Sequence, residues 1–258
     1  MLIVRELRLI ALPGIPEIER GAALAELLLA ALARARLALQ SGDILVLAQK
    51  IISKAEGRVV ALASVTPSER AQSLAREADK DPRIVELMLR ESRQVLRVKP
   101  GIIIVEHKLG FVMANAGIDQ SNVPDGDEAV LLLPKDPDAS ARKLRDELLD
   151  KSSVEAGVLI IDSFGRAWRN GVTGAAIGVA GLPALIDLRG NKDRGGRALK
   201  VTQVAAADEL AAAASLIMGQ ADEGTPAVLV RGFPYALHAQ RESSVKELLR
   251  PEAEDLFR

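Results

Sequence analysis

The chain has 258 residues, of which 48% are hydrophobic and 27% charged, so it can bury a core sufficient for one large domain or two lobes of a single unit. Its formal charge of −1 argues against a globally basic nucleic-acid binder and against an acidic disordered tail. The absence of cysteine excludes disulfide scaffolds, thiolate metal sites and cysteine nucleophiles, and two histidines leave little room for a multi-histidine metal site.

The first elements alternate between strand and helix patterns. Residues 2–10 have the composition of a strand and lead into a rigid loop at 12–16, which holds two prolines and a glycine. An apolar stripe predicts a long helix over 18–39, and the apolar run 44–48 predicts a buried strand.

The middle of the chain predicts two helices followed by three strands. Residues 66–69 have the pattern of a capping box with Thr66 as the cap, and Asp81 followed by proline marks the second helix start. The apolar runs 95–98, 102–105 and 111–114 are separated by tight turns, which favours a meander over a βαβ unit.

The last half of the chain returns to alternation. It predicts strands at 129–133, 158–161 and 227–230 and helices at 139–149 and 201–218. Strands that alternate with helices, together with a meander, indicate a mixed α+β fold.

No clean linker or internal repeat divides the chain. We therefore expect one unit over 1–245, followed at 246–258 by a charged tail that is either a terminal helix or the start of a connector. The N-terminal residues lack the order of a signal peptide and no apolar run is long enough to span a bilayer, so a cytoplasmic protein without membrane contact is expected.

The common nucleotide and hydrolase motifs are missing. There is no GxxxxGK[ST] and no GxGxxG between a strand and a helix, which argues against P-loop and Rossmann sites. There is no GxSxG either, so a Ser-His-Asp hydrolase is not indicated. Glycines 171, 174, 178 and 181 predict tight backbone packing in a strand-rich segment.

Two aspartates follow predicted strands in polar surroundings. Asp119 lies in the segment 115–123, where Asn122 can hydrogen-bond a phosphate or a base. Asp162 ends the strand 158–161 and is followed by the hydroxyl of Ser163. Carboxylates at strand ends can hold Mg²⁺ beside a nucleotide, so these two could share one ion or flank two. The structural alternatives are an Asx-type turn at Asp119 and a helix or turn cap at Asp162.

Three further segments carry cations or glycines. Segment 49–58 has two lysines, a serine and an arginine, which suits a phosphate cradle or an exposed charged turn. Between Arg189 and Lys200 there are five cations and one anion, which suits an anionic ligand or a solvated basic loop. Segment 218–226 follows a helix and suits a glycine helix stop.

Taken in order, six segments resemble the coenzyme F420:L-glutamate ligase family. They are LPGIP at 12–16, QKIISKAEGR at 49–58, NAGIDQSNV at 115–123, DSFGRAWRNG at 162–171, DLRGNKDRGGRALKVT at 187–202 and GQADEGTPAVLVRG at 219–232. Each segment alone is weak, but six in sequence are specific.

The resemblance implies a mixed-sheet fold distinct from P-loop and Rossmann proteins, in an intertwined homodimer. It implies a GTP-dependent ligase that uses Mg²⁺ or Mn²⁺, helped by a monovalent cation such as K⁺. The reaction implied is addition of L-glutamate to a deazaflavin precursor of coenzyme F420, first by an amide and then by γ-glutamyl linkages, through an acyl phosphate.

The same resemblance implies roles for individual residues. GTP contacts are implied at Leu12, Pro13, Gly14, Ile15, Gln49, Lys50, Lys54, Asn122, Met218, Gly219, Gln220, Ala221, Asp222, Glu223, Gly224 and Thr225. Metal contacts are implied at Asp119, Asp162, Ser163 and Gln220, with the two aspartates at the centre of catalysis. Arg189, Lys192 and Arg197 are candidates for binding substrate anions.

Two other interpretations stay open. One is a related nucleotide-dependent carboxylate–amine ligase with another acceptor. The other is a non-catalytic assembly module for a fused or partner reductase. In some bacteria the ligase domain is fused to a nitroreductase-like flavin domain, and residues 248–258 resemble the junction in such fusions.

Overall fold

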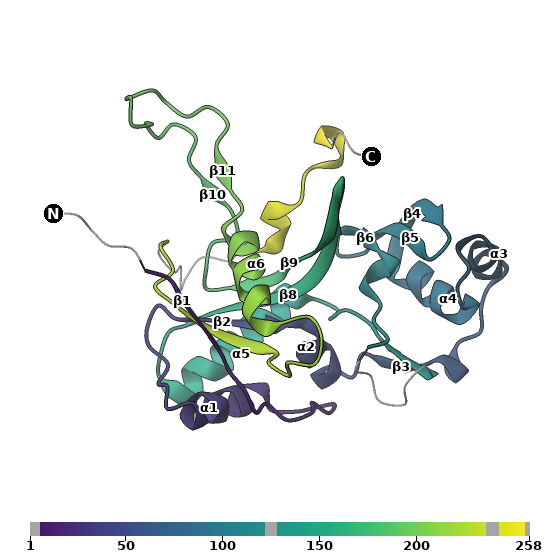
Figure 1. Ribbon diagram of the computed structural model, residues 1–258, viewed down its shortest axis with the longest axis horizontal. Helices are drawn as coiled ribbons and strands as arrows, with labels where there is room; N and C mark the ends of the chain where they lie inside the picture. Colours follow the sequence, from purple (N-terminus) through teal and green to yellow (C-terminus); the bar gives the residue numbers. More distant parts are fainter. Residues whose placement is uncertain (1–5, 122–127, 236–242, 256–258) are drawn as a thin grey trace.

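Five strands form the central sheet of the computed structural model, which describes residues 6–121, 128–235 and 243–255. The strand order is β1 (Arg8–Ala11), β12 (Ala227–Arg231), β2 (Ile44–Ala48), β8 (Gly157–Arg166) and β9 (Arg169–Ala180) (Figure 1). β2 and β8 are parallel and the other neighbours are antiparallel, so the sheet is mixed. The α+β class expected from the sequence is confirmed at this level.

Helices cover both faces of this sheet. α6 (Ala206–Met218) lies on one face, and α5 (Pro137–Ser152) lies on the other beside α1 (Leu24–Arg34). Two glycines of β9 permit this close packing. A Cβ at Gly174 would lie 2.4 Å from the Ala211 oxygen in α6, and one at Gly178 would lie 2.4 Å from the Pro137 oxygen in α5. The tight packing predicted for this segment is confirmed at these two positions.

A smaller lobe, on the right of Figure 1, has its own core. Its sheet is the predicted meander, β4 (Ser92–Lys99), β5 (Ile102–His107) and β6 (Val112–Ala114). It is covered by α3 (Glu69–Ala78) and α4 (Pro82–Glu91), whose apolar faces supply Ala71, Val85 and Met88 to that core.

Short elements complete the described chain. They are α2 (Gln49–Ala55), the pair β3 (Val59–Ala61) and β7 (Ala129–Leu131), the pair β10 (Ile186–Asp187) and β11 (Gln203–Val204), and 3₁₀ turns at Leu62–Ser64, Asn115–Gly117, Val245–Leu248 and Glu252–Glu254. The charged tail thus forms two short turns within the described residues.

Several predicted boundaries were wrong. The helix expected over 18–39 spans only α1, because Gly21 and Arg36 adopt left-handed φ angles of 82° and 56° on either side of it. Ser68 caps α3 instead of Thr66, and its hydroxyl accepts from the Ala71 N–H at 3.2 Å. The helix expected from 201 begins at Ala206, since residues 203–204 pair as β11. Of the described helices, none combines the length and apolarity needed to cross a bilayer.

Candidate functional site

Four of the six motif segments meet at one edge of the central sheet, namely the edge formed by the carboxyl ends of the inner strands β2 and β8. Because β2 and β8 are parallel, Ala48 pairs with Ile161, and the next residues are Gln49 and Asp162. β12 runs the opposite way and therefore begins at this edge, where the Ala48 N–H donates to the Pro226 oxygen at 2.9 Å. β1 ends there too, with the Leu12 N–H donating to the Ala227 oxygen at 2.9 Å. Segments 12–16, 49–58, 162–171 and 219–232 therefore lie side by side.

Asp119 reaches this edge from a loop beside the smaller lobe. Its backbone exchanges two hydrogen bonds with Leu131, at 3.0 and 2.8 Å. Its Oδ1 accepts from the backbone N–H and hydroxyl of Ser121, at 2.7 and 2.8 Å. Lys50 of α2 then forms an ion pair with Asp119 Oδ2 at 2.7 Å and also donates to the Ser121 hydroxyl at 2.7 Å. The Asx-type turn proposed as the structural alternative is present, and it orients the carboxylate.

The backbone before Asp119 is unusual. Asn115, Ala116 and Gly117 all adopt left-handed φ angles, of 52°, 54° and 64°. The Asn115 side-chain oxygen accepts from the Ile103 N–H at 3.1 Å and ties this turn to β5. For L-residues each such conformation costs about 1–2 kcal/mol, so tertiary contacts hold the turn that delivers Asp119.

Asp162 and Asp119 interact electrostatically. The pKa of Asp162 is raised to about 6, mainly by burial and to a smaller extent by the charge of Asp119, after the Ser163 backbone N–H and Lys50 have offset part of the rise. Burial also opposes ionisation of Asp119, but hydrogen bonds from Lys50 and Ser121 outweigh it and lower the pKa of that carboxyl. The two aspartates predicted to form the catalytic pair therefore converge, with one lysine between them as a partial counter-charge.

Ser163 and Gln220 form a second pair beside the first. The Ser163 hydroxyl donates to Gln220 Oε1 at 2.8 Å, and Gln220 Nε2 donates to the Ser215 hydroxyl of α6 at 3.3 Å. Successive side chains of a strand point to opposite faces, so Asp162 and Ser163 diverge from adjacent positions on β8. The structure thus brings the predicted metal ligands together as two pairs at one sheet edge.

Each of the two pairs offers oxygen donors of the kind that a hard divalent cation binds. Among the described residues no three Asp, Glu or His side chains are grouped as a metal cluster. Two carboxylates, a hydroxyl and an amide oxygen are nevertheless ligands that Mg²⁺ and Mn²⁺ accept, with water completing the shell. The mutual effect of two partly buried carboxylates is the observation that favours a cation here.

Two buried polar side chains of α2 also face this region of the chain. Lys54 is buried and is ion-paired with the exposed Glu17, directly after the 12–16 loop. Gln49 is 1% exposed, and its Oε1 accepts from the Ser53 hydroxyl at 2.7 Å. Its Nε2 is buried with no hydrogen-bond partner in the described structure. An unsatisfied buried donor is costly, which fits the expectation that Gln49 contacts a ligand.

The remaining predicted GTP contacts divide into three groups. In the first loop, Leu12 is buried, while Gly14 has a φ of 75° and its oxygen accepts from Arg34 at 2.7 Å. The turn 218–225 is closed by Thr225, whose hydroxyl donates to the Met218 oxygen at 2.9 Å. Asn122 lies outside the described residues.

The cationic segment lies away from the carboxylates. It forms the loop of the β10–β11 hairpin, which projects from the sheet in Figure 1. Arg189 pairs with Asp187 at 2.5 Å and Arg197 with Asp193 at 3.7 Å. Within the described residues, Arg189, Lys192 and Arg197 make no polar contact with Asp119 or Asp162.

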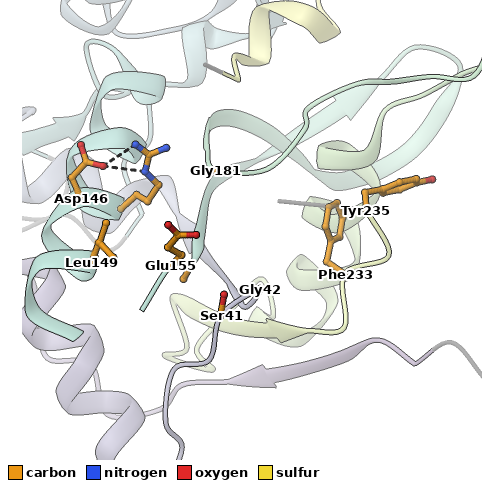
Figure 2. A pocket seen from close by; sticks show the side chains of 10 residues that line it. Ser41, Gly42, Asp146, Leu149, Glu155, Gly181, Phe233 and Tyr235 are labelled. Atoms are coloured by element: carbon orange, nitrogen blue, oxygen red, sulfur yellow. Dashed lines mark hydrogen bonds and ion pairs between the residues drawn. The ribbon is translucent and has the colours of Figure 1, made fainter. Parts of the chain in front are cut away.

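One cavity lies at the opposite ends of the strands β2, β8 and β12 (Figure 2). It has a volume of about 410 Å³. Ser41 and Gly42 precede β2, Ala156 precedes β8, and Phe233 follows β12, so all lie at the strand ends remote from Asp162. This cavity is therefore separate from the site.

Sequence reasoning missed several residues around the site. Glu17 and Ser121 had detectable signals, since one follows the proline-rich loop and the other stands two residues after Asp119, where an Asx turn donor is expected. Glu91 and His107 had none. They come from α4 and β5 and meet Arg58 only in the folded chain.

Known proteins resemble this chain over most of its length. The sequence pattern described as F420-0:Gamma-glutamyl ligase matches residues 14–232. The chain belongs to this family. It is 47% identical over 250 residues to "Coenzyme F420:L-glutamate ligase" of Methanothermobacter thermautotrophicus, covering 97% of this chain and 98% of that one. Proteins of the same name from Methanopyrus kandleri and Archaeoglobus fulgidus are 48% and 44% identical, covering 85% and 95% of this chain and 87% and 94% of theirs. The resemblance that the six segments suggested is thereby confirmed, and the matched range of the F420-0:Gamma-glutamyl ligase family includes Asp119, Asp162 and Gln220.

Proposed function

We propose that the chain is a GTP-dependent ligase that joins L-glutamate to a deazaflavin precursor of coenzyme F420. The observation that carries the proposal is the convergence of Asp119, Asp162 and Lys50 at the sheet edge where the other motif segments end. The relatives named as coenzyme F420:L-glutamate ligases supply the acceptor and the amino acid.

The proposed chemistry activates a carboxylate before amide formation. The precursor carboxylate attacks the γ-phosphorus of GTP, the bond to the bridging oxygen breaks, and GDP leaves with the electron pair. The glutamate amine then attacks the acyl carbon, phosphate leaves, and the amine loses a proton. Later additions activate the side-chain carboxyl of the bound glutamate, which gives γ-glutamyl linkages.

The side chains contribute mainly position and charge. All reactants are anionic, and phosphoryl transfer depends on alignment and charge neutralisation more than on covalent help from the protein. Lys50 and Lys54 of α2 would bind phosphate oxygens after exchanging their carboxylate partners, Asp119 and Glu17. Gln49 Nε2, which has no hydrogen-bond partner among the described residues, would donate to the nucleotide. Asp119, Asp162, Ser163 and Gln220 would hold Mg²⁺ or Mn²⁺, which when bound neutralises charge on the transferred phosphoryl group. A monovalent cation such as K⁺ is part of the proposal as an activator.

An intertwined homodimer is also proposed. Leu216 of α6 and Val201 before β11 are each 84% exposed in the single chain, and large apolar side chains with such exposure mark surfaces that a partner covers. Light scattering is expected to give twice the chain mass. Leu216→Glu should shift the mass toward the monomer, whereas the surface change Lys143→Glu on α5 should leave it unchanged.

The direct test of function is incubation with GTP, Mn²⁺, L-glutamate and the deazaflavin precursor, followed by mass spectrometry. The expected products carry one or more added glutamate residues, together with GDP in equal amount. Omission of glutamate and replacement of GTP by ATP are the controls.

Three outcomes would count against parts of the proposal. Equal turnover with ATP would remove the preference for guanine. GDP release with other acceptors but never with the deazaflavin would identify a related ligase. Absence of metal-dependent nucleotide binding in calorimetry would favour a non-catalytic assembly module.

A further inference from the structure

The motif 162–171 contains residues to which the proposed reaction gives no role. Beyond Ser163, β8 continues to Arg166, turns at Ala167 and Trp168, and returns as β9 from Arg169. We propose that the tip formed by Arg166, Trp168 and Arg169 is the subsite that binds the planar ring and phosphodiester of the acceptor. This inference rests on the function proposed above.

The backbone of Trp168 is strained. Its φ angle is 57°, in the left-handed region. Hairpin turns that need a left-handed residue usually place glycine or asparagine there, because a Cβ comes too close to the backbone. A bulky aromatic residue in this conformation is an outlier, and such strain is often found at binding sites. Trp168 therefore stands at a position that turn formation alone would give to a smaller residue.

The two arginines are also placed unfavourably for stability. Arg166 and Arg169 are cross-strand partners, and like charges directly opposite each other destabilise a hairpin. Within the described residues neither guanidinium has a carboxylate within 4 Å, and Arg166 donates to the Asn170 oxygen at 3.3 Å. An anion between them would remove the repulsion, and a phosphate matches the fork geometry of guanidinium donors.

The indole itself is the third feature. Trp168 is the only tryptophan in the chain, and it is 82% exposed. A planar heterocycle can stack on an exposed indole, and guanidinium groups beside it add cation–π attraction. One planar, phosphate-bearing ligand could thus contact the exposed indole and both cations together.

The tip lies within reach of the carboxylates. Arg166 is four residues beyond Asp162 on the same strand, about 13 Å at roughly 3.3 Å per residue. Figure 1 shows this hairpin extending from the sheet as a long twisted ribbon. Phe164 lies between Asp162 and Arg166 on β8, and its ring packs edge-on against the ring of Phe111, with 5.8 Å between the ring centroids. An extended acceptor could place its carboxylate near Asp119 and Asp162 and its ring at Trp168.

The single tryptophan gives a direct binding assay. Titration of the full-length protein with the deazaflavin precursor, without GTP, should quench the Trp168 emission in a saturable way. The deazaflavin nucleoside without the phosphodiester should bind at least about tenfold more weakly, because it lacks the group assigned to the arginines. Absence of saturable quenching by the precursor would overturn the proposal.

Three variants separate binding from folding. Trp168→Ala should raise the acceptor KM about tenfold or more while the KM for GTP changes less than about twofold. Trp168→Phe should restore most of the affinity, because a ring is retained. Arg166→Gln with Arg169→Gln should weaken binding of the precursor much more than binding of the nucleoside, because only the precursor carries the phosphodiester. Arg76→Gln, an exposed change on α3, is the matched control.

The outcomes distinguish this proposal from the general function. If the wild-type protein adds glutamate but Trp168→Ala binds the acceptor normally, the subsite is wrong and the ligase activity stands. If Trp168→Ala converts a dimer to a monomer in light scattering, the tip is a subunit interface and the proposal is overturned. If the wild-type protein forms no ligated product yet the precursor still quenches Trp168 in a phosphodiester-dependent way, the subsite stands and the proposed reaction fails.

Discussion

Asp162 destabilises the folded chain when it is ionised, yet its position suits it to bind a cation. It ends a fully buried apolar run on β8, where a charged carboxylate is poorly solvated, and it faces the charge of Asp119. Ionised carboxylates in such a place are costly for the folded chain but well suited to bind a cation and anionic phosphates through it.

Removing either central carboxylate should abolish most activity without unfolding the chain. Asp119→Asn and Asp162→Asn are each expected to lower kcat by roughly 10²-fold or more, because the charge that organises the phosphates is lost. Ligation assays and circular dichroism measure the two effects. Asp150→Asn, an exposed change on α5, should leave turnover unchanged, and near-normal turnover in both active-site variants would remove their assigned role.

The raised pKa of Asp162 also predicts a pH-dependent difference in stability. Since the pKa rises from 3.8 to about 6 on folding, the folded chain binds the proton more tightly, and ionisation of Asp162 destabilises it above about pH 6. In metal-free buffer at pH 8, Asp162→Asn should therefore have a higher Tm than the wild type, by about 2–4 °C for each kcal/mol of relief.

The same difference in Tm should shrink between pH 6 and pH 4 and vanish below. His107 also contributes to the pH dependence of stability, and it does so equally in the wild type and in Asp162→Asn. Burial first, and then the charges of Arg58, Lys108 and Arg93, lower its pKa to about 4, so its own effect is a loss of stability as pH falls below 6.5. Comparing the two proteins at each pH cancels that contribution. A Tm difference independent of pH would contradict the burial of Asp162.

At the scale of elements, β9 decides how closely the layers approach. Its glycines allow α5 and α6 to press on opposite faces of the sheet, and this is what brings Gln220, just after α6, to Ser163. The sequence predicted close packing in a strand-rich segment but not the bounds of β9, because glycine lowers strand propensity and masks the apolar alternation.

Substitutions of these glycines should test the packing. Gly178→Ala is expected to cost about 1–3 kcal/mol, because its Cβ would meet the Pro137 backbone rather than a movable side chain. Gly165→Ala on the neighbouring strand is the matched control, since nothing lies within 4 Å of its Cβ. Urea unfolding measures both. Equal stability of the two variants would show that α5 can shift away without loss.

Element prediction succeeded where local signals were complete. The strand at 44–48 and the helix beginning at Pro82 were predicted correctly, one from an unbroken apolar run and the other from an Asp-Pro start. Segment 49–58 was predicted only as a cradle or turn, although residues 49–55 form a helix. Its short length and mixed polarity give no clear 3.6-residue period.

At the scale of the whole molecule, a partly buried ionic junction joins the lobes. Arg58, after α2, donates to Glu91 at 2.6 Å and to the Leu133 oxygen at 2.8 Å. Glu91 ends α4, and its Oε2 lies 3.8 Å from His107 Nε2 at the end of β5. The helix that carries Lys50 is thereby tied to the lobe that adjoins Asp119.

Breaking this junction should cost more than breaking an exposed pair. Glu91→Ala leaves a mostly buried guanidinium unpaired, for an expected loss of about 2–3 kcal/mol in unfolding free energy. Glu147→Ala, which removes an exposed pair with Lys143 on α5, should change it by less than about 0.5 kcal/mol. Similar losses in both would mean that Arg58 finds another partner.

The candidate site was predictable in composition but not in geometry. Motif segments pointed to Asp119, Asp162, Lys50 and Gln220, yet their meeting depends on β2 and β8 being parallel neighbours and on β12 running between β1 and β2. Strand order is set by pairings across more than a hundred residues, which local patterns do not encode. The placement of the basic hairpin away from the carboxylates had no local signal either.

The two aspartates belong to differently anchored parts of the chain. Asp162 is fixed in the central sheet, whereas Asp119 follows Ile118, which packs against the smaller core. An ion or phosphate that bridges the two aspartates therefore binds most tightly to the relative orientation of the lobes that brings both carboxylates to it. By thermodynamic reciprocity, each contact that steadies that orientation tightens ion binding by the same factor. Mutations at the Arg58–Glu91 junction should accordingly change the metal affinity, although this junction is remote from the reacting atoms.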